Sequence, residues 1–96
     1  MIANRTDIAL QLVREEREKQ ERFKAEGRFT YTCADPEMSN YEKIVCLMEE
    51  VGEAAEEALC IDGSRQARGA FGTTEGLRGE LIQVAAVAIA HIEALL

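Results

Sequence analysis

Three glutamates fall within one turn of a predicted helix. Glu49, Glu50 and Glu53 lie in the stretch LMEEVGE, where side chains three or four residues apart are neighbours on a helix surface. No lysine or arginine between Lys43 and Arg65 neutralises them. Like charges at this spacing weaken a helix by roughly 0.2–0.5 kcal/mol per pair. A hard divalent cation such as Mg²⁺, which takes oxygen ligands, would relieve the repulsion, and a solvated acidic stripe is the alternative interpretation.

A second pair of oxygen-bearing side chains, Glu80 and Gln83, lies near the start of the apolar segment 75–95. Leucine, isoleucine and valine occur on nearly every side of this segment, which predicts a buried helix. A buried, ionised carboxylate without a partner is costly. Glu80 must therefore meet a cation, accept hydrogen bonds, take up a proton, or reach solvent near the helix start, where the helix dipole also favours its charge.

Glu50-x-x-Glu53, twenty-six intervening residues and Glu80-x-x-Gln83 together resemble the E-x-x-E…E-x-x-D signature of the MazG-like nucleotide pyrophosphohydrolases. These belong to the all-α NTP pyrophosphatase superfamily. LMEEVGEAAEEAL and GELIQVAAVAIAHIEAL are similar to the two metal helices of that family, and the resemblance covers residues 40–95. It implies a helical bundle, assembled as a homodimer or homotetramer. Such a bundle hydrolyses nucleoside triphosphates to monophosphate and pyrophosphate with Mg²⁺, or with Mn²⁺ as a substitute, and so clears surplus or non-canonical nucleotides.

The resemblance also implies roles for individual residues. Glu49 becomes the candidate catalytic residue that positions or deprotonates the attacking water. Gln83 departs from the family pattern, because an amide supplies no negative charge where the family has aspartate. The site can then work with fewer metal ions, rely on another acid such as Glu49 or Glu57, or bind nucleotide with poor turnover; we expect hydrolysis to be retained. The implied metal ligands are Glu50, Glu53, Glu80 and Gln83.

Three arginines of the glycine-rich stretch 62–79 are candidates for holding the terminal phosphates, because guanidinium groups suit phosphate oxygens. Solvated loop arginines are the alternative. The glycines form neither a P-loop, since no G-K-[S/T] follows them, nor a dinucleotide fingerprint. Kinase and Rossmann functions are therefore excluded. The three residues are Arg65, Arg68 and Arg78.

Helices are expected to position all of these residues. No run alternates with period two, and proline occurs once, so the sequence predicts an all-α bundle of three main helices with a short helical turn. Capping residues set the expected limits. These are residues 7–26 between Thr6 and Gly27, a helix from Asp35-Pro36 or from the capping box Ser39-x-x-Glu42 to residue 61, a turn at 65–70, and residues 75–95 after Thr73 or Thr74.

Several smaller expectations concern packing. Gly52, among the acids, suggests a close approach to the backbone or helix packing. Phe29 and Tyr31 either pack on the core or line a pocket, and core packing is favoured. His91 is expected to be packed or to lie at an interface. An apolar stripe of the second helix is expected to face the core, and its members are Ile44, Leu47, Met48, Val51, Ala55 and Ala58.

Length and charge limit the remaining possibilities. Ninety-six residues make one domain, residues 1–96. A monomer of this size is only marginally stable, so oligomerisation is expected to complete the bundle. A net charge of −7 argues against nucleic acid as a partner. Residues 81–96 are too few and too polar for a membrane span. The cysteines, which form no C-x-x-C pair, predict buried apolar residues in a reducing cytoplasm. The alternative to an enzyme is a non-catalytic helical oligomer or adaptor.

Overall fold

The computed structural model describes residues 4–62 and 72–96. Three α-helices account for most of them: α1 (Arg5–Ala25), α2 (Asn40–Ile61) and α3 (Thr74–Ala94). These two described ranges contain no strand, so the predicted all-α fold with three main helices is confirmed. The helical turn predicted at residues 65–70 lies outside the described residues.

The first helix begins two residues earlier than predicted. Asn4 is its N-cap, and its side-chain oxygen accepts a hydrogen bond from the backbone N–H of Asp7 at 2.9 Å. The predicted cap at Thr6 is therefore wrong; both are common capping residue types, and the helix extends to the earlier one. Gly27 follows the helix with φ at +81°, a conformation that favours glycine, as expected of the residue that ends it.

The other two helices begin at caps that the sequence offered. Ser39 and Glu42 form the complete capping box of α2, which decides between the two predicted start signals. Thr73 caps α3, because its side-chain oxygen accepts from the backbone N–H of Gly76 at 2.9 Å. Asp62 ends α2, as predicted.

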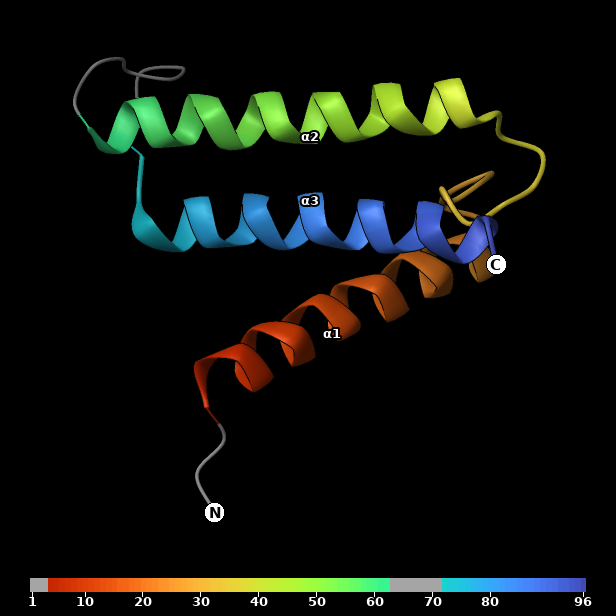
Figure 1. Cartoon of the computed structure of the whole chain (residues 1–96), viewed down its shortest axis with the longest axis horizontal. Coiled ribbons are helices and arrows are strands. Elements are labelled where there is room, and N and C mark those ends of the chain that lie inside the picture. The colour runs from red at the N-terminus through yellow and green to blue at the C-terminus, as the bar shows by residue number, and fades with distance from the viewer. Residues whose placement is uncertain (1–3, 63–71) are drawn as a thin grey trace.

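The helices are arranged with α3 in the middle (Figure 1). α2 and α3 run side by side in opposite directions, and α1 crosses the other side of α3, approaching it toward the C-terminal ends of both helices. Within the described ranges α1 and α2 do not pack against each other. The result is a flat molecule of 40 × 39 × 24 Å.

A polar network ties the connection between α1 and α2 to the end of α1. Asp35 pairs with Lys24 and accepts a hydrogen bond from the buried Thr32 N–H at 2.7 Å. The hydroxyl of Thr32 donates to Glu21 at 2.7 Å. Lys24, followed by the Thr32 N–H, lowers the pKa of Asp35, so the carboxylate is ionised at neutral pH. Asp35 thus folds the connection rather than starting α2.

Side-chain contacts also link the three helices. The buried guanidinium of Arg17 pairs with Glu21 at 2.5 Å and with Glu93 of α3 at 2.9 Å. At the other side of α3, His91 Nε2 lies 2.9 Å from the side-chain oxygen of Asn40 at the start of α2. His91 is therefore a packed residue that joins two helices, in agreement with the expectation.

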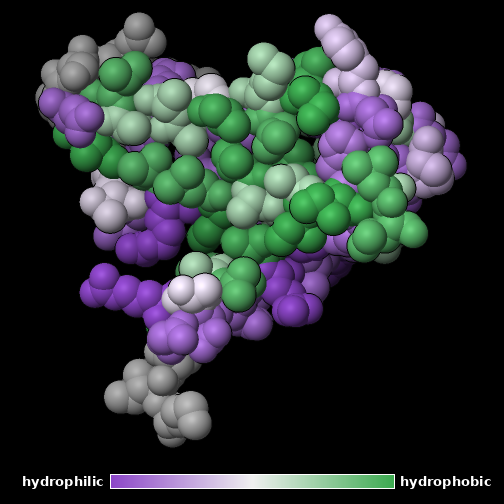
Figure 2. All heavy atoms as spheres, in the orientation of Figure 1, coloured by the Kyte–Doolittle hydropathy of each residue, from purple (hydrophilic) through white to green (hydrophobic). Residues whose placement is uncertain are grey.

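The buried apolar core consists mostly of small residues. Ala54 of α2 and Ala86 and Ala90 of α3 are buried, which lets these helices approach closely. Contrary to prediction, α3 is not buried all round, since Leu81 is 52% exposed. The apolar stripe of α2 also fails to face the core: Met48 is 67% exposed, because α2 turns its alanine and glutamate positions toward α3 instead. Apolar side chains accordingly gather on the surface over α2 and α3 (Figure 2).

Among the described residues, no helix combines the length and the hydropathy that crossing a bilayer requires.

Candidate metal centre

Three carboxylates from two helices converge at one point. Glu50 and Glu53 lie one turn apart on α2, and Glu80 lies on the neighbouring α3. One oxygen atom from each of the three side chains lies within 4.8 Å of the other two. Antiparallel packing of α2 and α3 thus brings both halves of the sequence motif together. We call these three residues the carboxylate cluster.

Among the described residues, the carboxylate oxygens of the cluster have too few hydrogen-bond donors around them to balance their negative charge. One oxygen of Glu50 and one of Glu80 are buried and have no hydrogen-bond partner among residues 4–62 and 72–96. Burial, and then the charges of Glu53 and Glu80, raise the pKa of Glu50. Burial, and then the neighbouring Glu53, raise the pKa of Glu80. Buried acceptors left without a partner are costly, and carboxylates more so than neutral groups.

The donor set fits a hard divalent cation. Carboxylate oxygens are the ligands that Mg²⁺ and Mn²⁺ prefer, and Mg²⁺ is commonly held by a few carboxylates together with substrate phosphates. A cation among the three side chains would give both unpartnered oxygens a partner. Glu53 is exposed, so the carboxylate cluster remains open to solvent and to a ligand on that side.

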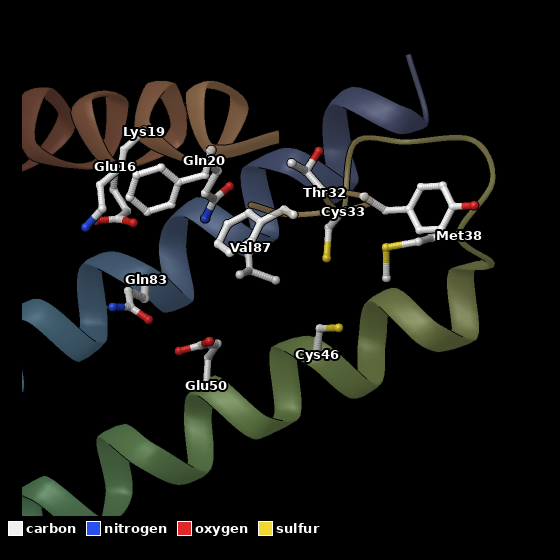
Figure 3. Close-up of a pocket in the computed structure, with 13 residues that line it drawn as sticks. Glu16, Lys19, Gln20, Thr32, Cys33, Met38, Cys46, Glu50, Gln83 and Val87 are labelled. Atoms are coloured by element: carbon white, nitrogen blue, oxygen red, sulfur yellow. The ribbon is translucent and has the colours of Figure 1, made fainter. Parts of the chain in front are cut away.

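Gln83 lies beside the carboxylate cluster, one turn after Glu80 on α3. It lines the same cavity as Glu50, and Figure 3 shows the two side chains reaching toward each other from α3 and α2. The predicted fourth position is therefore next to the other three. Its amide oxygen can be offered to a cation but adds no charge.

Two further acids, considered from the sequence, have different surroundings. Glu49 is exposed and is not one of the three converging carboxylates, although its charge contributes to the raised pKa of Glu50. Glu57 accepts a hydrogen bond from the backbone N–H of Thr73 at 2.8 Å, so one of its oxygens holds the start of α3 against α2. Of the two, Glu49 is the acid whose carboxylate remains exposed at the cluster.

Arg78, the candidate phosphate-binding arginine within the described ranges, is not brought to the carboxylate cluster. Arg78 lines a different groove, between the N-terminal halves of α1 and α3, together with Arg5. Arg65 and Arg68 lie outside the described residues. The positive side chain that does line the cavity next to the cluster is Lys19 of α1, which the sequence analysis did not single out.

The glycine that the packing requires is not the predicted one. A Cβ atom built on Gly52 would meet nothing within 4 Å, so neither a close approach nor helix packing within one chain explains this residue. A Cβ atom on Gly72 would lie 2.6 Å from the backbone oxygen of Glu57 and 2.9 Å from Cβ of Cys60. Gly72 therefore permits the close approach of the chain to α2 just before α3 begins.

A cavity of about 320 Å³ extends from the carboxylate cluster into the space between α1 and α2. Its lining starts at Glu50 and Gln83 and reaches Phe29 and Tyr31 in the connection. These two aromatic residues are 42% and 48% exposed, so the favoured prediction that they pack in the core is wrong. The sequence could not show this cavity, because it exists only where α1 and α2 fail to meet.

The cysteines are free, and two of the three are buried. Cys60 lies under the start of α3, and Cys33 lines the cavity, as does the half-buried Cys46. Burial, and then the neighbouring Cys46, raise the pKa of Cys33 to about 11. Cys33 is therefore a neutral thiol at physiological pH, which agrees with the predicted apolar role.

Comparison of the chain with family models, with curated proteins and with solved structures gave no match. The protein is therefore classified by its own fold and site. It is an all-α protein in which two antiparallel helices share a carboxylate cluster.

Proposed function

We propose that this protein is a Mg²⁺-dependent nucleoside triphosphate pyrophosphohydrolase, which converts a triphosphate and water to a monophosphate and pyrophosphate. The observation that carries the proposal is the carboxylate cluster, with buried, unpartnered oxygens on Glu50 and Glu80, at the end of a ligand-sized cavity. The motif resemblance supplies the reaction. A cavity next to a cation site gives room for the nucleoside of a triphosphate whose phosphoanhydride bond lies at the cation.

In this proposal Glu50, Glu53 and Glu80 hold the cation, and Gln83 offers an amide oxygen beside them. The chemistry that a bound Mg²⁺ or Mn²⁺ supplies is neutralisation of phosphate charge and activation of water. Such an ion is needed because the chain has a net charge of −7 and would otherwise repel a triphosphate.

Glu49 is the proposed catalytic base. It is exposed next to the carboxylate cluster, and its charge already acts on Glu50. A general base must reach the attacking water, and an exposed carboxylate can do so where a buried, fully bonded one cannot. Glu57 is unsuitable for this role because it is bonded to the start of α3.

The proposed active form is a homodimer or homotetramer. Large apolar side chains such as Met48, Val51 and Leu81 are exposed on α2 and α3, and a second copy of the chain would cover them. The buried core of one chain is small, so an interface would also add stability. The proposed location is the cytoplasm, which keeps free cysteines reduced, and no nucleic acid partner is proposed.

A pyrophosphate-release assay tests the reaction. The purified protein is incubated with Mg²⁺ or Mn²⁺ and a panel of standard and modified nucleoside triphosphates. We expect release from at least one of them, reduced about 100-fold or more by Glu53→Gln. Glu56→Gln is the matched control, because it removes the same charge from the same helix outside the carboxylate cluster.

Two results would contradict the proposal: no pyrophosphate from any substrate, or equal activity in Glu53→Gln and Glu56→Gln. The second candidate function, a non-catalytic helical oligomer or adaptor, would then be preferred. The exposed apolar side chains of α2 and α3 are the observation that favours it.

A further inference from the structure

The cavity beside the carboxylate cluster has the size and position of a site for the organic part of a substrate. Its volume is about 320 Å³, within the usual range for ligand pockets. It is bounded by α1, the connection, α2 and α3, since α1 and α2 remain apart. At one end it includes Glu50 and Gln83, so a group that occupies it lies next to the carboxylate cluster.

Aromatic side chains form part of the wall of this cavity. Phe23 and Phe29 meet edge to face, with ring centroids 5.4 Å apart. Arg28 lies over the ring of Phe23 at 3.7 Å and supports it, and Tyr31 also lines the cavity. Exposed aromatic faces bind planar heterocycles by stacking, whichever base they carry. The wall is therefore suited to a flat ring.

Gln20 places a neutral amide on the α1 side of the cavity, where Glu16 and Lys19 are the charged neighbours in the lining. It lies on α1 and is half-buried, and Figure 3 shows its amide group turned toward the cavity. The hydroxyl of Thr32, another polar group of the lining, already donates to Glu21. No side-chain hydrogen bond between described residues involves Gln20. With respect to the described part of the chain, its two donors and its acceptor oxygen therefore remain available to a ligand.

We propose that this cavity binds the base of the nucleotide and that the Gln20 amide determines which base is preferred. This inference rests on the proposed function, because it places the phosphates at Glu50 and the base at Phe23 and Phe29. A side-chain amide pairs with adjacent donor and acceptor groups on a base edge, as glutamine does with adenine. Gln20 is thus a specificity-determining residue, and the aromatic wall supplies stacking that does not depend on the base.

The test compares Gln20→Leu, which keeps the volume and removes the hydrogen bonds, with Gln11→Leu as the matched control. Gln11 lies on the same helix, is exposed and contacts Glu15, outside the cavity. Each protein is measured for kcat/KM across the triphosphate panel, for Mn²⁺ affinity and for hydrolysis of inorganic tripolyphosphate. Binding of phosphate-free nucleosides is followed by chemical shift changes in NMR spectra.

We expect Gln20→Leu to reduce the ratio of kcat/KM between the best and worst bases about tenfold, as expected for the loss of one or two hydrogen bonds. Nucleoside binding should lose its base preference in the same variant. Mn²⁺ affinity and tripolyphosphate hydrolysis should not change, and Gln11→Leu should behave as the parent. A base ranking in Gln20→Leu equal to that of the parent would overturn the inference.

Failure of the inference and failure of the proposed function give different results. Parent protein that hydrolyses triphosphates but shows nucleoside shifts away from Phe23, Phe29 and Gln20 would overturn the inference alone. Parent protein that releases no pyrophosphate from any triphosphate would overturn the proposed function, and the inference with it. Thermal melting of each variant verifies that the substitutions leave the fold intact.

Discussion

Glu50 and Glu80 each bury a carboxylate oxygen to which no group in the described ranges donates a hydrogen bond. A folded protein retains such groups at a cost to stability, and functional sites are where this cost is most often found. The carboxylate cluster therefore has opposite effects on stability and on cation binding. The same charges that would bind a cation destabilise the protein when no cation is bound. Removing one charge separates the two effects.

Glu50→Gln is expected to stabilise the metal-free protein at neutral pH. Burial, and then Glu53 and Glu80, raise the pKa of Glu50 in the folded state, so folding disfavours its ionised form. The penalty is therefore present at pH 7 and disappears as the pH falls through the raised pKa. Calorimetry in EDTA at pH 7 should show that Glu50→Gln has a free energy of unfolding about 1 kcal/mol higher than the parent, and a melting temperature about 5 °C higher. Below about pH 4 the two proteins should be equally stable.

The same calorimetry contains its own control. Glu56→Gln, on the same helix but outside the carboxylate cluster, should change the melting temperature much less. Saturating Mn²⁺ should raise the melting temperature of the parent and leave Glu50→Gln nearly unchanged, because only a bound ligand stabilises the folded state. If the parent were more stable than Glu50→Gln in EDTA at pH 7, the negative charge of Glu50 would not destabilise the folded protein, which would contradict this prediction.

Gln83→Asp is expected to tighten cation binding about tenfold, or about 1.4 kcal/mol, because it adds a charge next to Glu50 and Glu80. Isothermal titration with Mn²⁺ measures the affinity, and the pyrophosphate assay should show turnover equal to or above that of the parent. Gln11→Glu adds the same charge at an exposed position of α1 outside the cavity and is the control. Weaker binding and lower turnover in Gln83→Asp would show that the amide has a function of its own.

Each half of the carboxylate cluster could be predicted from the sequence, since side chains three residues apart on a helix share an edge, whereas the meeting of the two halves was implied only by the motif resemblance. That argument places Glu50 beside Glu53 and Glu80 beside Gln83. The position of Gln20 could not be predicted, because α1 carries charged residues on most sides and no periodicity marks the face that meets the cavity. Arg78 was assigned by residue type alone, and the structure places it in another groove.

At the scale of elements, the site depends on how closely α2 and α3 approach. Alanines line part of their interface, and Gly72 lets the chain pass next to the backbone of α2 before α3 begins. Glu57 then holds the first turn of α3 through the Thr73 N–H. Any displacement at this junction moves Glu80 relative to Glu50 and Glu53.

Gly72→Ala is expected to destabilise the protein by about 2 kcal/mol, because its Cβ would overlap backbone atoms of α2 that cannot move independently. Gly79→Ala is the matched control: a Cβ there meets nothing within 4 Å, and alanine favours a helix over glycine by about 1 kcal/mol. Urea denaturation measures both. Equal stability of the two variants would show that the junction is not tightly packed.

The helix limits were largely predictable, because capping residues act locally. Ser39 and Glu42 determine the start of α2, whereas the cap of α1 is Asn4 instead of Thr6, because both residues can serve as a cap. The orientation of α2 was not predictable from its apolar stripe. In a single chain, α2 turns small residues such as Ala54 and the glutamates of the carboxylate cluster toward α3. Its large apolar side chains remain exposed.

At the scale of the whole molecule, one chain has a small core and large exposed apolar side chains on α2 and α3. A chain of this size buries too little of its surface to be very stable alone. The fold class followed from the sequence because helix periodicity is local. The cavity and the exposed surfaces depend on how the three helices are placed, which local patterns do not specify.

The parent chain is expected to form a dimer or tetramer, with a mass in light scattering of two or four times 10.6 kDa. Met48→Glu places a charge on the exposed apolar stripe of α2 and should shift the population toward monomer at micromolar concentration. Gln11→Glu adds the same charge to an exposed polar position of α1 and should not. A monomeric parent, or an unchanged oligomer in Met48→Glu, would contradict this assignment of the interface.

Titration of the purified protein with Mn²⁺ tests most directly whether Glu50, Glu53 and Glu80 form a cation site. Electron paramagnetic resonance distinguishes bound from free Mn²⁺ and needs no substrate or turnover. We predict saturable binding by the parent and by Glu56→Gln, and loss of that binding in Glu53→Gln and Glu80→Gln. Binding that is absent in the parent, or equal in all four proteins, would contradict the account.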